Sequence, residues 1–309
     1  MVYTDVVQAL IMITTLIVGP IVGFIYIANT PNLFAHSITD ALTKAGSTYT
    51  SLTGAATGFG VGVVIMSGFS WFFGYLGGQP QLSTRFMAIK DPRHAKQGRN
   101  IGIAWTMIAY IGALCLGWIG LAVFGPTGLA DQEYVMPAVL LKIFPPAIAA
   151  VLIMGAIAAM ISTADSLLIL SASELSDNLI NPYFAKKTTD DAKRKKDALN
   201  RARLVTAILA IIALGVAYIS PSKLIFTMVS YVWAGIGGTF SVVILFTLFW
   251  KRYHGKAVIA TILSGVTFTI LWNLTGMEKK ITARIMTFLV TAILAVIYTY
   301  VWHKKKERI

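Results

Sequence analysis

The sequence has little of what soluble enzymes and redox proteins depend on. It contains one cysteine, Cys115, so an intrachain disulfide is excluded. Its four histidines do not follow an HExxH spacing, and it has neither paired cysteine ligands nor a phosphate-binding glycine loop. We therefore predict that the chain is not an enzyme and holds no cofactor.

Charged residues are also scarce, at 13% of the chain, whereas 56% is hydrophobic. Soluble domains are only about 45–50% apolar. The formal net charge is +13, but the basic residues lie in short segments between apolar runs, without an aromatic-basic module. Attraction to anionic lipid headgroups explains such a charge, so we predict a lipid bilayer as partner and no nucleic acid. No pattern indicates an oligomeric state.

Long apolar runs recur along the whole chain, each able to cross a hydrocarbon core of about 30 Å. They predict an all-α membrane protein in which residues 1–309 form a single transmembrane domain. We expect about eight spans, at residues 5–28, 59–86, 101–124, 147–177, 203–219, 224–250, 256–274 and 284–303.

The 26 Lys and Arg residues are divided unequally between the two sides of the predicted membrane. Six lie on one side, namely Lys44, Lys142, Lys223, Lys279, Lys280 and Arg284. All others follow even-numbered spans or lie in the tail. The positive-inside rule then predicts a multi-pass protein of the plasma membrane with a cytoplasmic C-terminus.

The second predicted span concentrates helix breakers, namely Gly68, Gly74, Gly77, Gly78 and Pro80. Proline removes an amide donor, and paired glycines let a helix unwind. Unwound backbone at membrane depth is tolerated where it lines a cavity, and broken helices mark transporter binding sites. Trp71 and Tyr75, one turn apart, can form an aromatic wall there. The alternative is close helix packing through small residues, with a simple proline kink.

The fourth predicted span carries a polar patch, namely Ser162, Thr163, Asp165 and Ser166. An ionised carboxylate within a membrane helix costs about 2.5 kcal/mol or more unless something compensates it. Hydroxyls beside a carboxylate can offer oxygen ligands to sodium, so a cation or a proton is expected. Alternatively, the hydroxyls bond to their own helix. Asp5 is either an ordinary helix N-terminal carboxylate or, with Asp165, half of the aspartyl dyad of an intramembrane hydrolase.

Three further segments are candidate gates. Tyr231 and Trp233 lie among glycines in the sixth predicted span, where core packing is the alternative. The segments 29–58 and 137–144 are expected on the outer face, the second as a short re-entrant helix.

Several stretches resemble the sodium:solute symporter family, especially its sodium/proline permease branch. They are Tyr3–Gln8, Ser70–Trp71, Gly74–Tyr75, Gln79–Pro80, Arg85–Ala88, Ala158–Thr163, Val229–Tyr231 and Trp233–Gly235. The resemblance implies a fold of two inverted five-helix repeats. Our first span would end the first repeat, the next five would form the second, and the last two would be peripheral. The chain would then be the N-terminally truncated, C-terminal part of that fold.

The resemblance also implies roles for individual residues. The main sodium site would take the carbonyl of Ala159 and the hydroxyls of Ser162 and Thr163. A second cation site would combine Ser162 with Asp5, Asp165 and Ser166. Solute contacts would come from Trp71, Tyr75, Gln79, Pro80, Tyr231 and Trp233.

The function implied is sodium-coupled symport of a small organic solute, an amino acid such as proline, by alternating access. Two departures from the proline-carrier pattern stand out. The segment Leu76–Gly78 is one residue longer than expected, and Ser241–Val242 replaces Gly-Pro. A solute-sensing or accessory membrane protein on the same scaffold is the alternative function.

Overall fold

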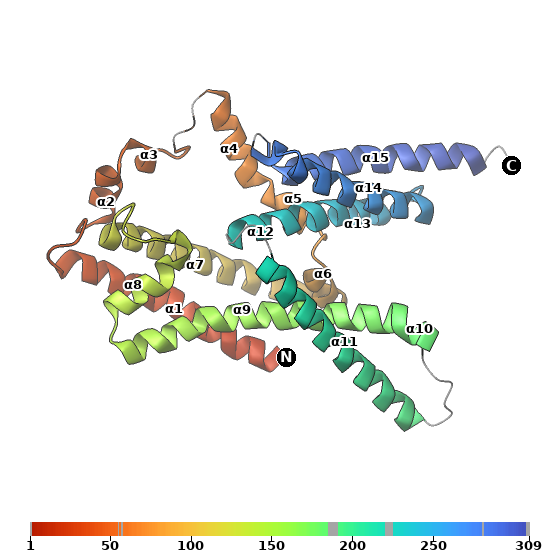
Figure 1. Cartoon of the computed structure of the whole chain (residues 1–309), viewed down its shortest axis with the longest axis horizontal. Helices are drawn as coiled ribbons and strands as arrows, with labels where there is room; N and C mark the ends of the chain where they lie inside the picture. Colours follow the sequence, from red (N-terminus) through yellow and green to blue (C-terminus); the bar gives the residue numbers. More distant parts are fainter. Residues whose placement is uncertain are drawn as a thin grey trace. The chain divides into compact units, whose positions relative to one another are not determined.

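The computed structural model describes residues 2–54, 56, 58–184, 191–219, 225–279 and 281–306 (Figure 1). These residues are helical almost throughout and include no β-strand, which confirms the predicted all-α class. They divide into two compact units. Unit one comprises Met1–Gly46 and Lys96–Pro221, and unit two comprises Ser47–Ala95 and Ser222–Ile309.

The apolar helices agree with the predicted multi-pass organisation. Within the described residues, six helices are long and apolar enough to cross a membrane, or up to seven if one bent pair counts as a span. The predicted span at 224–250 is divided into α12 (Ile225–Val232), the π-helical η3 (Trp233–Gly238) and α13 (Thr239–Phe249). The total of eight spans and the inverted repeat remain predictions.

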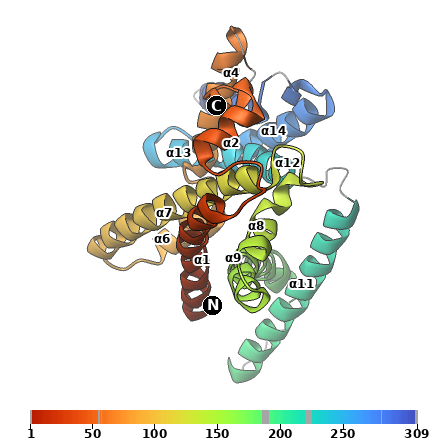
Figure 2. The same ribbon diagram turned by 90° about the vertical axis from the view of Figure 1, so that its left-hand side faces the viewer.

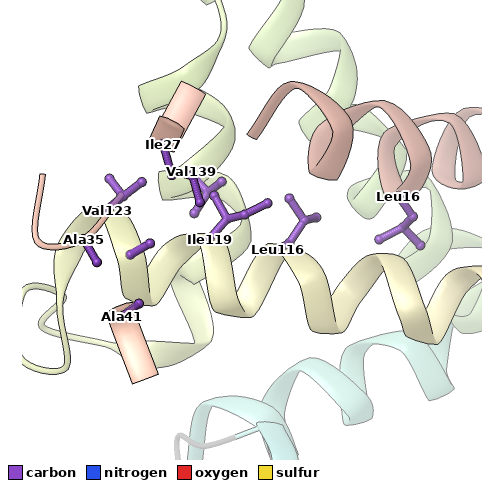
Figure 3. Close-up of a cluster of buried hydrophobic side chains, with 9 residues drawn as sticks. Leu16, Ile27, Ala35, Ala41, Leu116, Ile119, Val123 and Val139 are labelled. Atoms are coloured by element: carbon purple, nitrogen blue, oxygen red, sulfur yellow. The ribbon is translucent and has the colours of Figure 1, made fainter. Parts of the chain in front are cut away.

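Unit one is built around the long helices α1 (Val2–Asn29), α7 (Pro92–Phe124) and α9 (Pro146–Leu175). Its other elements are α2 (Ile38–Ala45), η1 (Gln132–Tyr134), α8 (Val135–Ile143), η2 (Ser176–Ile180), α10 (Asn181–Phe184) and α11 (Asp191–Ile219). Buried aliphatic side chains from α1, α7 and α8, among them Ile27, Ile119 and Val139, form its core (Figure 3). The helix α1 lies beside α9 (Figure 2).

Small residues allow the helices of unit one to approach closely. A Cβ atom added to Gly112 would lie 2.1 Å from the carbonyl oxygen of Leu16, so α1 and α7 are almost in backbone contact there. On α9, the carbonyl of Leu152 accepts a hydrogen bond of 3.0 Å from Thr15 of α1. Interfaces with small residues and hydroxyl bonds are typical of membrane helices.

Two segments predicted as loops contain helices. On the expected outer face, α2 is capped by the Ser37 hydroxyl, and a hydrogen bond from Lys44 lowers the pKa of the Asp40 carboxyl. On the expected cytoplasmic face, α11 already begins at Asp191, because its first turns are rich in Ala, Lys and Arg, which favour helices. Lys186, Lys187, Lys223, Lys280 and Arg308, all part of the charge count above, lie outside the described residues. The predicted helix at 137–144 corresponds to α8.

Unit two contains α3 (Ser47–Thr50), α4 (Phe59–Phe69), α5 (Trp71–Tyr75), α6 (Pro80–Met87), α12, η3, α13, α14 (Gly255–Leu274), η4 (Met277–Lys279) and α15 (Ala283–Lys306). The helices α14 and α15 pack along each other (Figure 1). At their interface the buried hydroxyls of Thr269 and Thr287 are 2.7 Å apart and share a hydrogen bond. The helices α14 and α15 pack against η3 and α13, which in turn contact α5.

Candidate functional site

The second predicted span is broken where the glycines and the proline predict a break. The helix stops at Tyr75 and resumes at Pro80, and its two parts are bent by 44°. Gly77 has a φ of +98°, a backbone conformation that glycine adopts at little cost. Pro80 occupies the first turn of α6, where its missing N–H would have no helical partner anyway.

Other parts of unit two satisfy the backbone at this break. The N–H of Gly78 donates to the Ser241 hydroxyl (3.1 Å), and the carbonyl of Gly77 accepts from the Ser83 hydroxyl (2.9 Å). A Cβ atom on Gly78 would lie 2.0 Å from the carbonyl oxygen of Gly237, so η3 packs directly on the unwound segment. The break is therefore held in place by specific contacts within unit two and is not a simple proline kink.

Three aromatic side chains, all predicted above as solute contacts, gather beside the break. The ring of Trp233 lies 6.2 Å from that of Trp71 and 5.3 Å from that of Tyr75, measured between centroids. The indole Nε1 of Trp233 is buried and has no hydrogen-bond partner among the described residues. The sequence did not show that η3 would bring Trp233 onto α5.

The other predicted solute contacts differ in how they are placed. Gln79 is buried, and its side-chain amide donates to the carbonyl of Gly74 (3.4 Å), so it holds the break together. Pro80 is exposed. Tyr231 is 40% exposed, and in the described part of the chain its ring contacts none of the three aromatics.

Sequence reasoning missed a buried cation beside this aromatic group. Arg284, counted above among outer loop charges, is the second residue of α15 and only 5% exposed. Its guanidinium carbon lies 4.4 Å from the centroid of the Trp71 ring. Its nitrogens donate to Ser70, Ser230 and Ser67. The sequence feature that could have indicated this buried polar site is the pair of serines at 67 and 70, which lie three residues apart and so on one face of an apolar helix.

In unit one, the structure brings together two residues of the predicted second cation site. Asp5 on α1 accepts a hydrogen bond of 2.7 Å from the Ser162 hydroxyl on α9. Both side chains are half-buried. The two residues are 157 positions apart in sequence, so it is the packing of α1 against α9 that brings them into contact. Charge-assisted bonds of this kind are stronger than neutral ones.

The remaining predicted cation ligands also lie on α9. The Thr163 hydroxyl donates to the carbonyl of Ala159 (3.1 Å), which is the self-bonding alternative, and both residues line a shallow hollow. Asp165 is exposed, and Ser166 is half-buried one turn beyond Ser162. Within the described residues, no group of three or more His, Cys, Asp or Glu side chains could hold a metal ion.

Comparison with known proteins decides the family. The family model described as "Sodium:solute symporter family" matches residues 1–265. The chain belongs to the sodium:solute symporter family. It is similar to the osmoregulated proline transporter OpuE of Bacillus subtilis, with 32% identity over 90% of this chain and 54% of OpuE. The high-affinity proline transporter PutP of the same organism is also 32% identical, over 89% of this chain and 55% of PutP.

A third relative supports the same assignment. The sodium/proline symporter 2 of Staphylococcus saprophyticus is 31% identical over 87% of this chain and 50% of its own length. The chain thus spans about half the length of the curated relatives it matches. Membership of the sodium:solute symporter family, together with the apolar helices, makes it a multi-pass membrane protein. The family also implies sodium as the coupling ion.

Proposed function

We propose that this chain carries proline, or a similar small amino acid, across the membrane together with sodium. The observation that carries the proposal is the broken span with aromatic rings beside it. Discontinuous membrane helices mark the binding sites of secondary transporters. Trp71, Tyr75 and Trp233 offer apolar faces on which a pyrrolidine ring can pack. The relatives' names, two proline transporters and a sodium/proline symporter, supply the choice of proline.

Sodium would bind in unit one. Its main ligands would be the carbonyl of Ala159 and the hydroxyls of Ser162 and Thr163, because a hard cation prefers oxygen ligands. The Thr163 hydroxyl already donates to the carbonyl of Ala159, so a cation bound between these two oxygens would replace that one hydrogen bond. A second cation would be held by Asp5 and Ser162, with Asp165 and Ser166 one turn along α9.

Coupling then follows from the membrane potential and the sodium gradient. One positive charge crossing 100 mV supplies about 2.3 kcal/mol. Sodium binding would favour an outward-open arrangement, and solute binding at the break would permit the change to an inward-open one. Such a cycle is alternating access, in which helix bundles rock around a fixed site.

The test is uptake by the purified chain in liposomes. We expect radiolabelled proline to accumulate when sodium is outside and potassium inside, and not when choline replaces external sodium. A parallel assay with a proton gradient and no sodium distinguishes sodium coupling from proton coupling. Equal uptake in sodium and choline, or accumulation driven by protons alone, would refute sodium coupling.

We further propose that the C-terminus and the loop between α13 and α14 are cytoplasmic. Cys115 is the only cysteine, so a Cys115→Ser background lets single cysteines report their side of the membrane. Lys251→Cys, in the exposed α13–α14 loop, should react with a membrane-impermeant maleimide only in permeabilised cells. Thr43→Cys, exposed on α2, should react in intact cells. The reverse pattern would invert the proposed topology.

A further inference from the structure

The buried guanidinium of Arg284 has no carboxylate partner in the part of unit two that the structure describes. It donates four hydrogen bonds, three to serine hydroxyls and one to a backbone carbonyl. Glu278, in the preceding η4, attracts the guanidinium through space but takes its hydrogen bond from the Ala283 N–H. Every hydrogen-bond partner of the cation is therefore neutral.

This arrangement is costly for a merely structural contact. Arg284 is only 5% exposed. A cation buried to this extent loses several kcal/mol of hydration, and hydrogen bonds to neutral hydroxyls do not cancel its charge. Buried ionisable residues in membrane helices commonly mark a ligand site.

We propose that Arg284, with the hydroxyls of Ser67 and Ser230, binds a small monovalent anion. The anion is either the carboxylate of the carried amino acid or a free halide. The carboxylate source rests on the proposed function, whereas the halide source does not.

The donors present suit such an anion. The hydroxyls of Ser67 and Ser230 both accept from Arg284, and in the described residues neither donates to a protein acceptor, so each O–H can turn toward an anion. The Ser70 hydroxyl donates to the Ser67 carbonyl and holds the serine pair in place. Trp71 contacts both the guanidinium and Trp233, and the buried indole N–H of Trp233, which has no partner among the described residues, is an additional donor.

The experiment measures anion binding to the purified chain in nanodiscs of neutral phosphatidylcholine, with the bulky anion MES replacing chloride. Acetate and chloride are titrated at constant sodium while tryptophan fluorescence and the unfolding temperature are followed. We expect saturable changes in both, because Trp71 lies against the guanidinium. Competition by L-proline but not by L-prolinamide identifies the carboxylate source. Chloride binding without competition by proline identifies the halide source.

Variants tie the binding to the proposed residues. Arg284→Gln should abolish the saturable change, and Arg284→Lys should weaken it about tenfold because an ammonium lacks the planar set of donors. Ser230→Ala should weaken it several-fold. Arg252→Gln removes an exposed arginine of the same unit and should leave binding unchanged.

The proposal fails if the wild-type chain shows no saturable change with either anion, or if Arg284→Gln binds as the wild type does. If Arg284→Gln does not fold, wild-type affinity in both Arg284→Lys and Ser230→Ala refutes the site. Sodium-driven uptake without Arg284-dependent anion binding would overturn this inference alone. Arg284-dependent binding without sodium-driven uptake would overturn the transport proposal alone.

Discussion

Gly78→Ala is expected to destabilise the protein strongly and to abolish uptake. The added methyl carbon would lie 2.0 Å from the carbonyl oxygen of Gly237 and 2.6 Å from the hydroxyl of Ser241. The nearer of these two atoms belongs to the backbone of η3, so η3 must move away from the break to make room for the methyl group. Overpacking of this kind costs about 1–3 kcal/mol, which should lower the unfolding midpoint by several degrees.

Gly62→Ala is the matched control in the same broken span. No atom lies within 4 Å of its added carbon, and alanine favours a helix over glycine by about 1 kcal/mol. We therefore expect an unchanged or slightly raised unfolding midpoint and normal uptake. Thermal unfolding of both variants decides the matter, and equal midpoints would mean that η3 does not press on the unwound segment.

Asp5→Asn and Ser162→Ala should each raise the sodium concentration needed for half-maximal uptake by about tenfold. Ser162→Ala removes the hydrogen bond between α1 and α9, whereas Asp5→Asn keeps an acceptor oxygen but removes its charge; a hydrogen bond to a charged group contributes about 1.5–3 kcal/mol. A tenfold change corresponds to about 1.4 kcal/mol. The half-saturating proline concentration at saturating sodium should change much less.

The double variant provides a sharper comparison. Because the two residues share one bond, the effect of Asp5→Asn with Ser162→Ala should be smaller than the two single effects combined. Ser171→Ala, an exposed hydroxyl elsewhere on α9, should leave sodium activation unchanged. Purely additive effects, or unchanged sodium activation in both single variants, would remove Asp5 and Ser162 from the cation site.

The sequence was most informative where backbone chemistry is local. Paired glycines before Pro80 predict a break without reference to the rest of the chain, and the structure breaks there. The apolar runs likewise predict the helices, since length and hydropathy suffice. The contact between Asp5 and Ser162 was expected only from the family resemblance, because 157 residues separate them and no local pattern links α1 to α9.

The Arg284 cluster could not be predicted in this way. An arginine at a span end is normally a loop charge, and the sequence does not indicate that α15 packs against α4 and α5. Thr163 illustrates a second limit of prediction from sequence. Whether a hydroxyl bonds to its own helix or binds an ion depends on its rotamer, which the sequence leaves open, and in the structure it bonds to Ala159.

The hydrogen bond between Gly78 and Ser241 has an evolutionary consequence. It joins the two places where this chain departs from the expected proline-carrier pattern, the longer segment 76–78 and the serine at 241. The hydroxyl of Ser241 satisfies the buried Gly78 amide, and loss of that hydroxyl would leave the amide without its acceptor. We therefore expect a substitution at 241 to be tolerated only where the segment 76–78 also changes, which a comparison of family sequences can check.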